Sequence, residues 1–158
     1  MEFTESEEIR SLRDTLRRFV EKECTSEVAT KWDKEDHIPR EIMLKLADLG
    51  LCGLCVSEEH GGMGRQVVAM TVVLEELSCG SVALSGLYNM NAGYGGMNIS
   101  ESGSEEQKRR LLPGLLEGKL LFAYDLSEPD VGADLGNVKT RAERKGDKVS
   151  IERDLVHR

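Results

Sequence analysis

The chain has 158 residues and a net charge of −8 at pH 7, with 39% hydrophobic and 32% charged residues, which is ordinary for a soluble globular protein. Its acidic balance, with no basic stretch longer than Lys108-Arg109-Arg110, argues against binding to nucleic acid. No apolar window is long enough to span a bilayer, and the acidic N-terminus lacks the pattern of a signal peptide. We therefore expect a cytoplasmic protein, and a mitochondrial matrix protein whose presequence has been removed stays open.

Two of the four cysteines, Cys52 and Cys55, have the CxxC spacing that is seen in redox and zinc sites. The pair lies in the apolar run 51–56, no second CxxC supplies the other two zinc ligands, and the three histidines are scattered. We expect these cysteines to be free, buried, small hydrophobic residues, and we expect no metal site.

Apolar residues at steps of three and four predict the first two helices. Residues 4–30 read as one long amphipathic helix, in which Thr4 and Glu7 have the spacing of a capping box. A second helix is expected to begin at Pro39, whose missing N–H costs nothing in a first turn, and to stop at Gly50.

The next part of the chain predicts three more helices, at 65–79, 81–98 and 105–117. The glycine-rich stretch 60–64 before them must be a turn or loop. The helix at 81–98 is nearly uncharged on all sides, so it should lie at the centre of the fold. Ser104 and Gln107 form a capping box at the start of the last helix.

The pattern changes at Gly118, where strand-like sequence begins. A short apolar run at 120–124 is followed by a break at Pro129 and Gly132, and then by two alternating segments, 138–142 and 148–151, with 145–147 as a hairpin turn. We predict a mainly α fold: an N-terminal bundle of about five to six helices (1–118), followed by a short, incomplete antiparallel β segment (119–158).

Three local strings resemble motifs of the acyl-CoA dehydrogenase family. They are Glu-Glu-His-Gly-Gly-Met-Gly at 58–64, Gly-Ser-Glu-Glu-Gln-Lys at 103–108, and Ala-Tyr-Asp-Leu-Ser-Glu-Pro-Asp-Val-Gly-Ala-Asp at 123–134. Each string alone is a weak signal, whereas their order and spacing together are specific. In that family a helical domain leads, a β-barrel-like domain follows, and a four-helix domain closes the unit. The resemblance therefore implies an N-terminal fragment that is not expected to be active alone.

The resemblance also implies a reaction, which is the FAD-dependent α,β-dehydrogenation of an acyl-CoA thioester. A carboxylate base removes the α-proton, and none of Glu58, Glu75 or Glu128 matches the position of that base. The implied partners are the acyl-CoA substrate and an electron-transfer flavoprotein or similar acceptor, and full-length members of the family are homo-oligomers.

By the resemblance, Tyr124, Leu126 and Ser127 fall on positions that contact the flavin ring. Gly132 and Ala133 fall near the cofactor and the CoA portion, although Ala133 lacks the hydroxyl of the serine that is common there.

The candidate acyl-pocket residues are Leu87 and Met90, for which core packing is at least as good an interpretation. Without the resemblance, Ser127 would be read as a turn cap and Tyr124 as a half-buried strand aromatic.

Two other functions are compatible with the sequence. One is a non-catalytic helical interaction module that has kept the family's fold and lost its chemistry. The other is a family relative with acyl-CoA oxidase or reductase chemistry.

Overall fold

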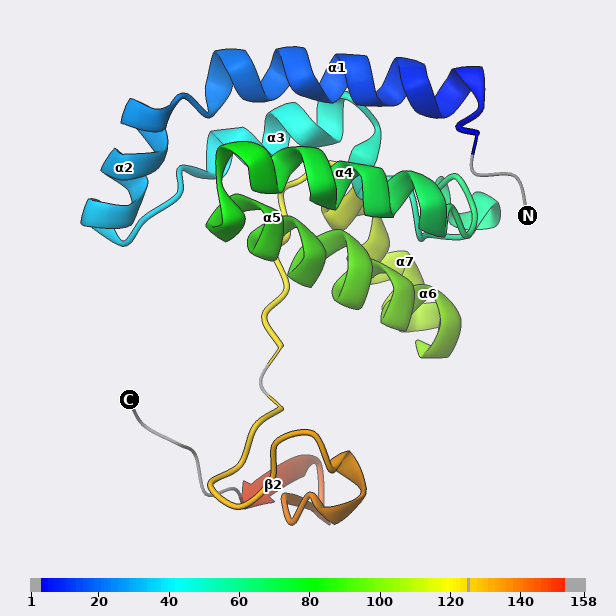
Figure 1. Ribbon diagram of the computed structural model, residues 1–158. Helices are drawn as coiled ribbons and strands as arrows, with labels where there is room; N and C mark the ends of the chain where they lie inside the picture. The colour runs from blue at the N-terminus through cyan, green and yellow to red at the C-terminus, as the bar shows by residue number, and fades with distance from the viewer. Residues whose placement is uncertain (1–3, 125, 153–158) are drawn as a thin grey trace. The chain divides into compact units, whose positions relative to one another are not determined.

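The computed structural model describes residues 4–124 and 126–152, which form two units that divide between Ala123 and Tyr124 (Figure 1). The first unit is helical, and the second contains the only strands among the described residues. This confirms the predicted class, a mainly α fold with a short antiparallel β segment. The domain boundary predicted after residue 118 stays a prediction.

Among the described residues, the helical unit contains six helical rods, which are joined by loops of different lengths (Figure 1). In chain order its elements are α1 (Glu7–Glu23), α2 (Ser26–Glu35), α3 (Arg40–Asp48), the 3₁₀ turns η1 (Leu51–Gly53) and η2 (Glu58–His60), α4 (Val67–Gly80), α5 (Val82–Tyr88), the π-helix η3 (Asn89–Gly96), α6 (Met97–Ser102) and α7 (Glu105–Leu116). No helix among the described residues combines the length and the apolar character needed to cross a membrane.

The single helix predicted over residues 4–30 is wrong, because the helix is interrupted at Cys24 and Thr25. Cys24 leaves the helical region, and Thr25 has an extended backbone whose side chain accepts a hydrogen bond from the Val28 N–H. Thr25 is thus the N-cap of a new helix, a position that threonine favours. The capping box predicted at Thr4 is also wrong, since Ser6 caps α1 instead.

Helices α5, η3 and α6 form one continuous rod, which confirms the predicted helix at 81–98. The backbone stays in the right-handed helical region at Tyr88 and at Met97, on either side of the π-helix. As predicted, much of this rod is buried: Tyr88 and Ala92 have no exposed surface. The Tyr88 hydroxyl donates a 2.8 Å hydrogen bond to the Leu51 carbonyl, which ties the rod to η1.

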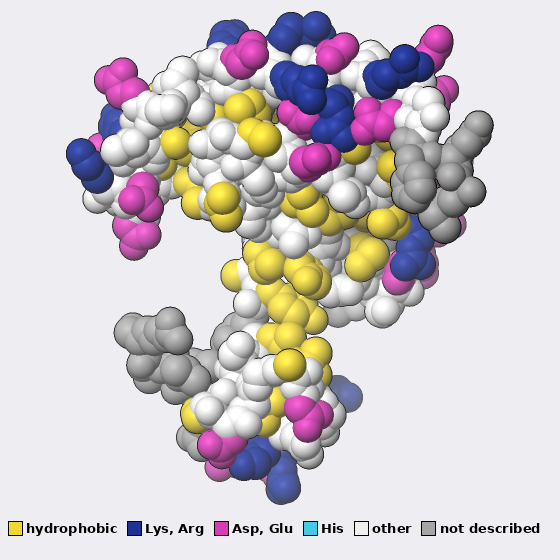
Figure 2. All heavy atoms as spheres, viewed as in Figure 1, with side chains coloured by type: hydrophobic (Ala, Val, Ile, Leu, Met, Phe, Trp, Pro, Cys, Tyr) yellow, Lys and Arg dark blue, Asp and Glu magenta, His cyan; other side chains and the backbone are white. Residues whose placement is uncertain are grey.

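The core of the helical unit consists mainly of aliphatic side chains, in keeping with the low aromatic content. Its fully buried members include Leu16, Met43, Leu46, Leu77, Leu84, Leu112 and Leu115. On the surface, acidic and basic side chains are mixed over α1, whereas the only charged side chains of α4 are Glu75 and Glu76 (Figure 2). Arg13 of α1 links the two helices through ion pairs with Glu75 at 2.8 Å and Glu76 at 2.5 Å.

The glycine-rich loop between α3 and α4 folds back on the apolar run before it. The Met63 N–H donates to the Gly53 carbonyl at 2.9 Å, and the Gly64 N–H donates to the Val56 carbonyl at 2.8 Å. Between them, Gly62 leaves no room for a side chain, because an added Cβ would lie 2.1 Å from the Val56 carbonyl oxygen. The prediction of a loop at 60–64 is confirmed, and its central glycine is required by close backbone contact.

The second unit contains one hairpin, made of β1 (Arg141–Lys145) and β2 (Lys148–Glu152). The strands are antiparallel, with Arg141 opposite Glu152 and Lys145 opposite Lys148. The hairpin and its turn were predicted, but the first strand begins at residue 141 and not at 138. The apolar run at 120–124 is not a strand, because it pairs with no other strand among the described residues.

Cys24, Cys52 and Cys55 are buried free thiols, as was expected for the CxxC pair, whereas Cys79 is exposed. Burial raises the pKa of Cys24 and of Cys52 to about 11. Because the thiolate is the reactive form, we expect Cys79 to react first with a thiol reagent at neutral pH. Counting labelled thiols by mass spectrometry checks this: one should be modified in the folded chain and four after unfolding. Rapid labelling of Cys52 in the folded chain would contradict its burial.

Candidate functional site

A tight turn at 128–131 lies at the centre of the predicted flavin-facing segment. The Glu128 N–H donates to the Val131 carbonyl at 3.0 Å, and the Val131 N–H donates to the Glu128 carbonyl at 3.2 Å. This pair of bonds closes an isolated antiparallel bridge around Pro129. The turn therefore brings together two parts of the predicted site, residues 126–127 before it and residues 132–133 after it.

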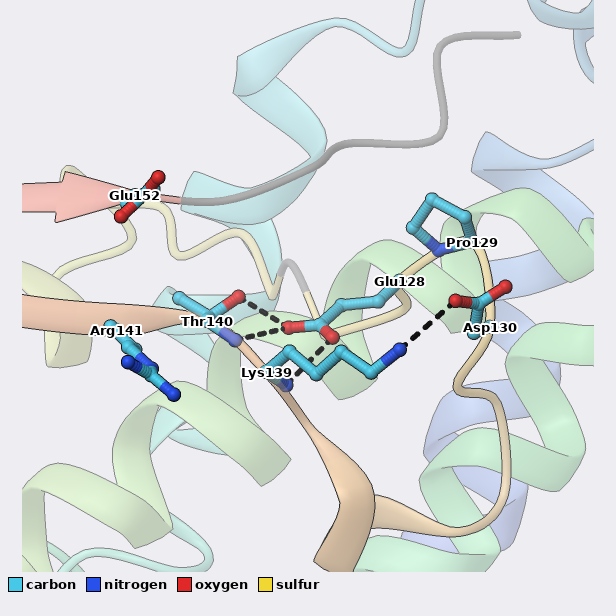
Figure 3. A pocket seen from close by; sticks show the side chains of 7 residues that line it. All are labelled: Glu128, Pro129, Asp130, Lys139, Thr140, Arg141 and Glu152. Carbon is cyan, nitrogen blue, oxygen red and sulfur yellow. Dashed lines mark hydrogen bonds and ion pairs between the residues drawn. The ribbon is translucent and has the colours of Figure 1, made fainter.

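The side chain of Glu128 anchors this turn to the start of β1 (Figure 3). Its carboxylate accepts hydrogen bonds from the Lys139 N–H at 2.8 Å and the Thr140 N–H at 2.7 Å, and also from the Thr140 hydroxyl. Glu128 is 7% exposed, so these bonds satisfy a buried charge. They also explain why the first strand starts late, since the N–H groups at 139 and 140 are used by the glutamate. We name this arrangement the Glu128 clamp.

The Glu128 clamp was not predicted from the sequence, in which Glu128 was a candidate only for a catalytic base. The three donors come from residues 139–140, and nothing in the local pattern indicates a contact across that separation. One chemical signal was available. Glu128 is an acidic residue next to Pro129, and it forms a β-bridge with Val131, an apolar residue that is 4% exposed.

The predicted flavin-contact residues lie on the surface of the second unit. Tyr124 is 49% exposed and Leu126 is 36% exposed, and Ser127, Gly132 and Ala133 are also exposed. Tyr124 lies in no strand among the described residues, so only the strand part of the alternative interpretation is wrong. Among the described residues, no group accepts a hydrogen bond from the N–H of Leu126, Gly132 or Ala133. The residues that flank the turn thus present three backbone N–H donors, for which the described part of the chain has no acceptor.

A hollow of about 370 Å³ lies on the second unit and is shown in Figure 3. It is lined by Glu128, Pro129, Asp130, Lys139, Thr140, Arg141 and Glu152, and so contains none of the predicted flavin contacts. Lys139 and Asp130 form an ion pair at its edge, 3.1 Å apart. The mixed charge of this lining does not indicate any one class of ligand.

Both candidate acyl-pocket residues, Leu87 and Met90, belong to the helical unit, where they are partly buried. Leu87 packs against the core and also lines a hollow of about 750 Å³ together with Trp32 and Val82. The structure therefore supports core packing for Leu87 and leaves its role towards an acyl chain a prediction. Met90 lies one turn earlier in η3 than Tyr94, which is 39% exposed.

Of the three glutamates considered as a catalytic base, two are engaged in interactions with other residues of the chain. Glu75 forms its ion pair with Arg13, and Glu128 forms the clamp. Glu58 lies in the exposed 3₁₀ turn η2. Among the described residues, no three His, Cys, Asp or Glu side chains lie close enough together to hold a metal ion.

Comparison with known proteins identifies the class to which this chain belongs. The match covers the helical bundle and its glycine-rich loop. The family model for the acyl-CoA dehydrogenase N-terminal domain matches residues 6–119. The chain therefore belongs to the acyl-CoA dehydrogenase family.

Individual relatives agree with this assignment. The chain is 37% identical over 122 residues to the mitochondrial isobutyryl-CoA dehydrogenase of Dictyostelium discoideum, which covers 75% of this chain and 28% of the relative. The solved glutaryl-coenzyme A dehydrogenase glutaryl-CoA complex superposes with a TM-score of 0.85 and 34% identity, over 96% of this chain and 39% of that one. A chain in the structure of the electron transferring flavoprotein of Acidaminococcus fermentans matches with a TM-score of 0.80 and 31% identity, over 96% of this chain and 40% of that one. The chain thus spans two fifths or less of the length of each of these proteins.

Proposed function

We propose that this chain is part of an FAD-dependent acyl-CoA dehydrogenase, which removes hydrogen from the α and β carbons of an acyl-CoA thioester. The observation that carries the proposal is the family match over residues 6–119, which is supported by the solved glutaryl-coenzyme A dehydrogenase structure that matches 96% of this chain. The relatives named for isobutyryl-CoA and glutaryl-CoA support an acyl-CoA substrate. The match to a flavoprotein structure supports an electron-transfer flavoprotein as the acceptor.

The residues on either side of the turn fit a flavin in three respects. They offer backbone N–H donors at Leu126, Gly132 and Ala133, which suit the carbonyl and nitrogen acceptors of a flavin ring edge. A Cβ added at Gly132 would meet no atom within 4 Å, so that side of the turn is open to a ligand. The exposed ring of Tyr124 supplies an apolar surface against which a planar group can stack.

Under this proposal the chain's residues bind and orient the cofactor and do not move the α-proton. FAD, when bound, supplies the hydride acceptor for the β carbon. Tyr124, Leu126 and Ser127 would contact the flavin ring, and Gly132 and Ala133 would lie near the cofactor and the CoA portion. The Glu128 clamp would hold the turn in one conformation, which lowers the ordering cost of binding. We assign no catalytic base among residues 4–124 and 126–152, and we propose the cytoplasm or the mitochondrial matrix as the location.

An NMR titration of the isotopically labelled 158-residue chain with FAD tests this assignment. We expect FAD to shift the amide signals of Ser127, Gly132 and Ala133, and Ser127→Ala to reduce the affinity. Ser150→Ala, on the exposed strand β2, is the matched control and should have no effect. Absence of any shift in the turn at millimolar FAD would contradict the proposed flavin contacts.

We expect the affinity of this chain for FAD to be weak, with a dissociation constant of about 10 µM or higher. The reason is that the candidate contacts lie on one exposed turn, so the chain can cover only part of the cofactor. Isothermal titration calorimetry measures this constant. Tight, stoichiometric binding together with turnover of an acyl-CoA would show that the 158 residues suffice for the site.

A further inference from the structure

Near the end of the helical unit, Phe122 packs into a notch on the π-helix η3. Asn91 and Gly95 form this notch. The Asn91 Oδ1 accepts a 3.1 Å hydrogen bond from the Phe122 N–H. The Phe122 ring lies against Gly95, where an added Cβ would be 2.5 Å from the ring carbon Cγ. One residue therefore holds the backbone of Phe122, and the other makes room for its ring.

The chemistry of Asn91 indicates that this contact is not there for stability alone. Asn91 has no exposed surface, and its Nδ2 has no hydrogen-bond partner among the described residues. A buried donor without an acceptor destabilises a fold, so an aliphatic residue would suit the core better. The asparagine also lies in a π-helix, a rare element that is frequent at functional sites.

The position of Phe122 in the chain suggests what the notch does. Phe122 is two residues before Tyr124, the first candidate flavin contact, and the run at 120–124 pairs with no strand in the part of the chain that the structure describes. We propose that Asn91 is a positioning residue, which acts through the Phe122 N–H to fix where the flavin-facing segment leaves the helical unit. This inference rests on the proposed function for its purpose, although the contact itself is independent of flavin.

Amide hydrogen exchange of the 158-residue chain, followed by NMR, tests the inference. In Asn91→Leu we expect the Phe122 amide to exchange about tenfold faster, because its acceptor is gone. The thermal midpoint of the helical unit should stay the same or rise, because the unpaired buried donor is removed as well. If the variant instead lowered the midpoint and accelerated exchange at all helical amides to the same extent as at Phe122, Asn91 would act on the stability of the whole unit, and that result would overturn the proposal.

A second variant and a control keep the test informative. Gly95→Ala places a Cβ against the Phe122 ring and should also accelerate exchange at Phe122, whereas Asn98→Leu, at an exposed position of α6, should not. Under FAD titration, Asn91→Leu should reduce the response of Tyr124 at least about threefold. Wild-type protein with a protected Phe122 amide but no FAD response would overturn the proposed function and leave the Phe122 contact supported.

Discussion

Gly62→Ala should lower the free energy of unfolding of the helical unit by about 3 kcal/mol. The new Cβ would lie 2.1 Å from the Val56 carbonyl oxygen and 2.5 Å from its carbonyl carbon, and backbone atoms cannot yield as a flexible side chain does. The loop would have to move away from the run at 53–56, which would break the bonds from Met63 and Gly64. Urea unfolding followed by far-UV circular dichroism measures the change.

Gly86→Ala is the matched control for this prediction. Gly86 lies in α5, and a Cβ at that position meets no atom within 4 Å, so the substitution adds helix propensity and no clash. It should stabilise the helical unit by about 0.5–1 kcal/mol. If both alanine variants shifted the urea midpoint in the same direction, close backbone contact at Gly62 would not be the cause of its effect.

The helices were predictable because their signals are local. The Ser104 and Gln107 pair is a capping box in the structure, and the uncharged stretch of α5 and η3 supplies fully buried residues such as Leu84, Tyr88 and Ala92, as its composition indicated. The break at Thr25 was missed because the apolar spacing runs through it, while its one signal, a threonine that can cap a helix, is common at other positions as well.

Contacts between distant residues were not predictable in the same way. The Asn91–Phe122 bond joins residues 31 positions apart, and the bond from Thr140 to Glu128 spans 12. The Phe122 N–H lies in the apolar run where strand-like sequence was predicted to begin, and the Thr140 N–H lies in an alternating segment that was predicted as a strand. Where a side chain from another segment accepts a hydrogen bond from these N–H groups, they do not bond to a neighbouring strand. The observed strand boundaries therefore differ from the predicted ones at these positions.

The candidate site came from the resemblance and not from the chemistry of single residues. Ser127, Gly132 and Ala133 are ordinary surface residues in isolation, and no pKa pattern or metal-ligand spacing marks them. The structure adds the reason for their arrangement: a two-bond turn around Pro129 places them at its two ends. What a flavin would contact there remains part of the proposal.

Glu128→Ala should unfold the second unit while leaving the helical unit intact. The substitution removes a buried carboxylate that accepts from three donors at residues 139–140, and hydrogen bonds to a charged group contribute about 1.5–3 kcal/mol each. A two-stranded hairpin is marginally stable at best in water, so the unit has little stability to lose. In an NMR spectrum, signals of residues 126–152 should collapse towards random-coil positions, whereas those of α1 to α7 should stay in place.

Two milder changes locate the cause of this effect in the carboxylate. Glu128→Gln keeps the shape of the side chain but replaces one acceptor oxygen by an NH₂ group, so either the Lys139 or the Thr140 amide should lose its protection from exchange. Asp130→Asn, in the same turn, removes only an exposed ion pair with Lys139 and should change stability by less than about 0.5 kcal/mol. Full protection of both amides in Glu128→Gln would show that the turn is held by something other than the clamp. Because the turn joins the candidate flavin contacts at 126–127 to those at 132–133, the order of the proposed site depends on the clamp.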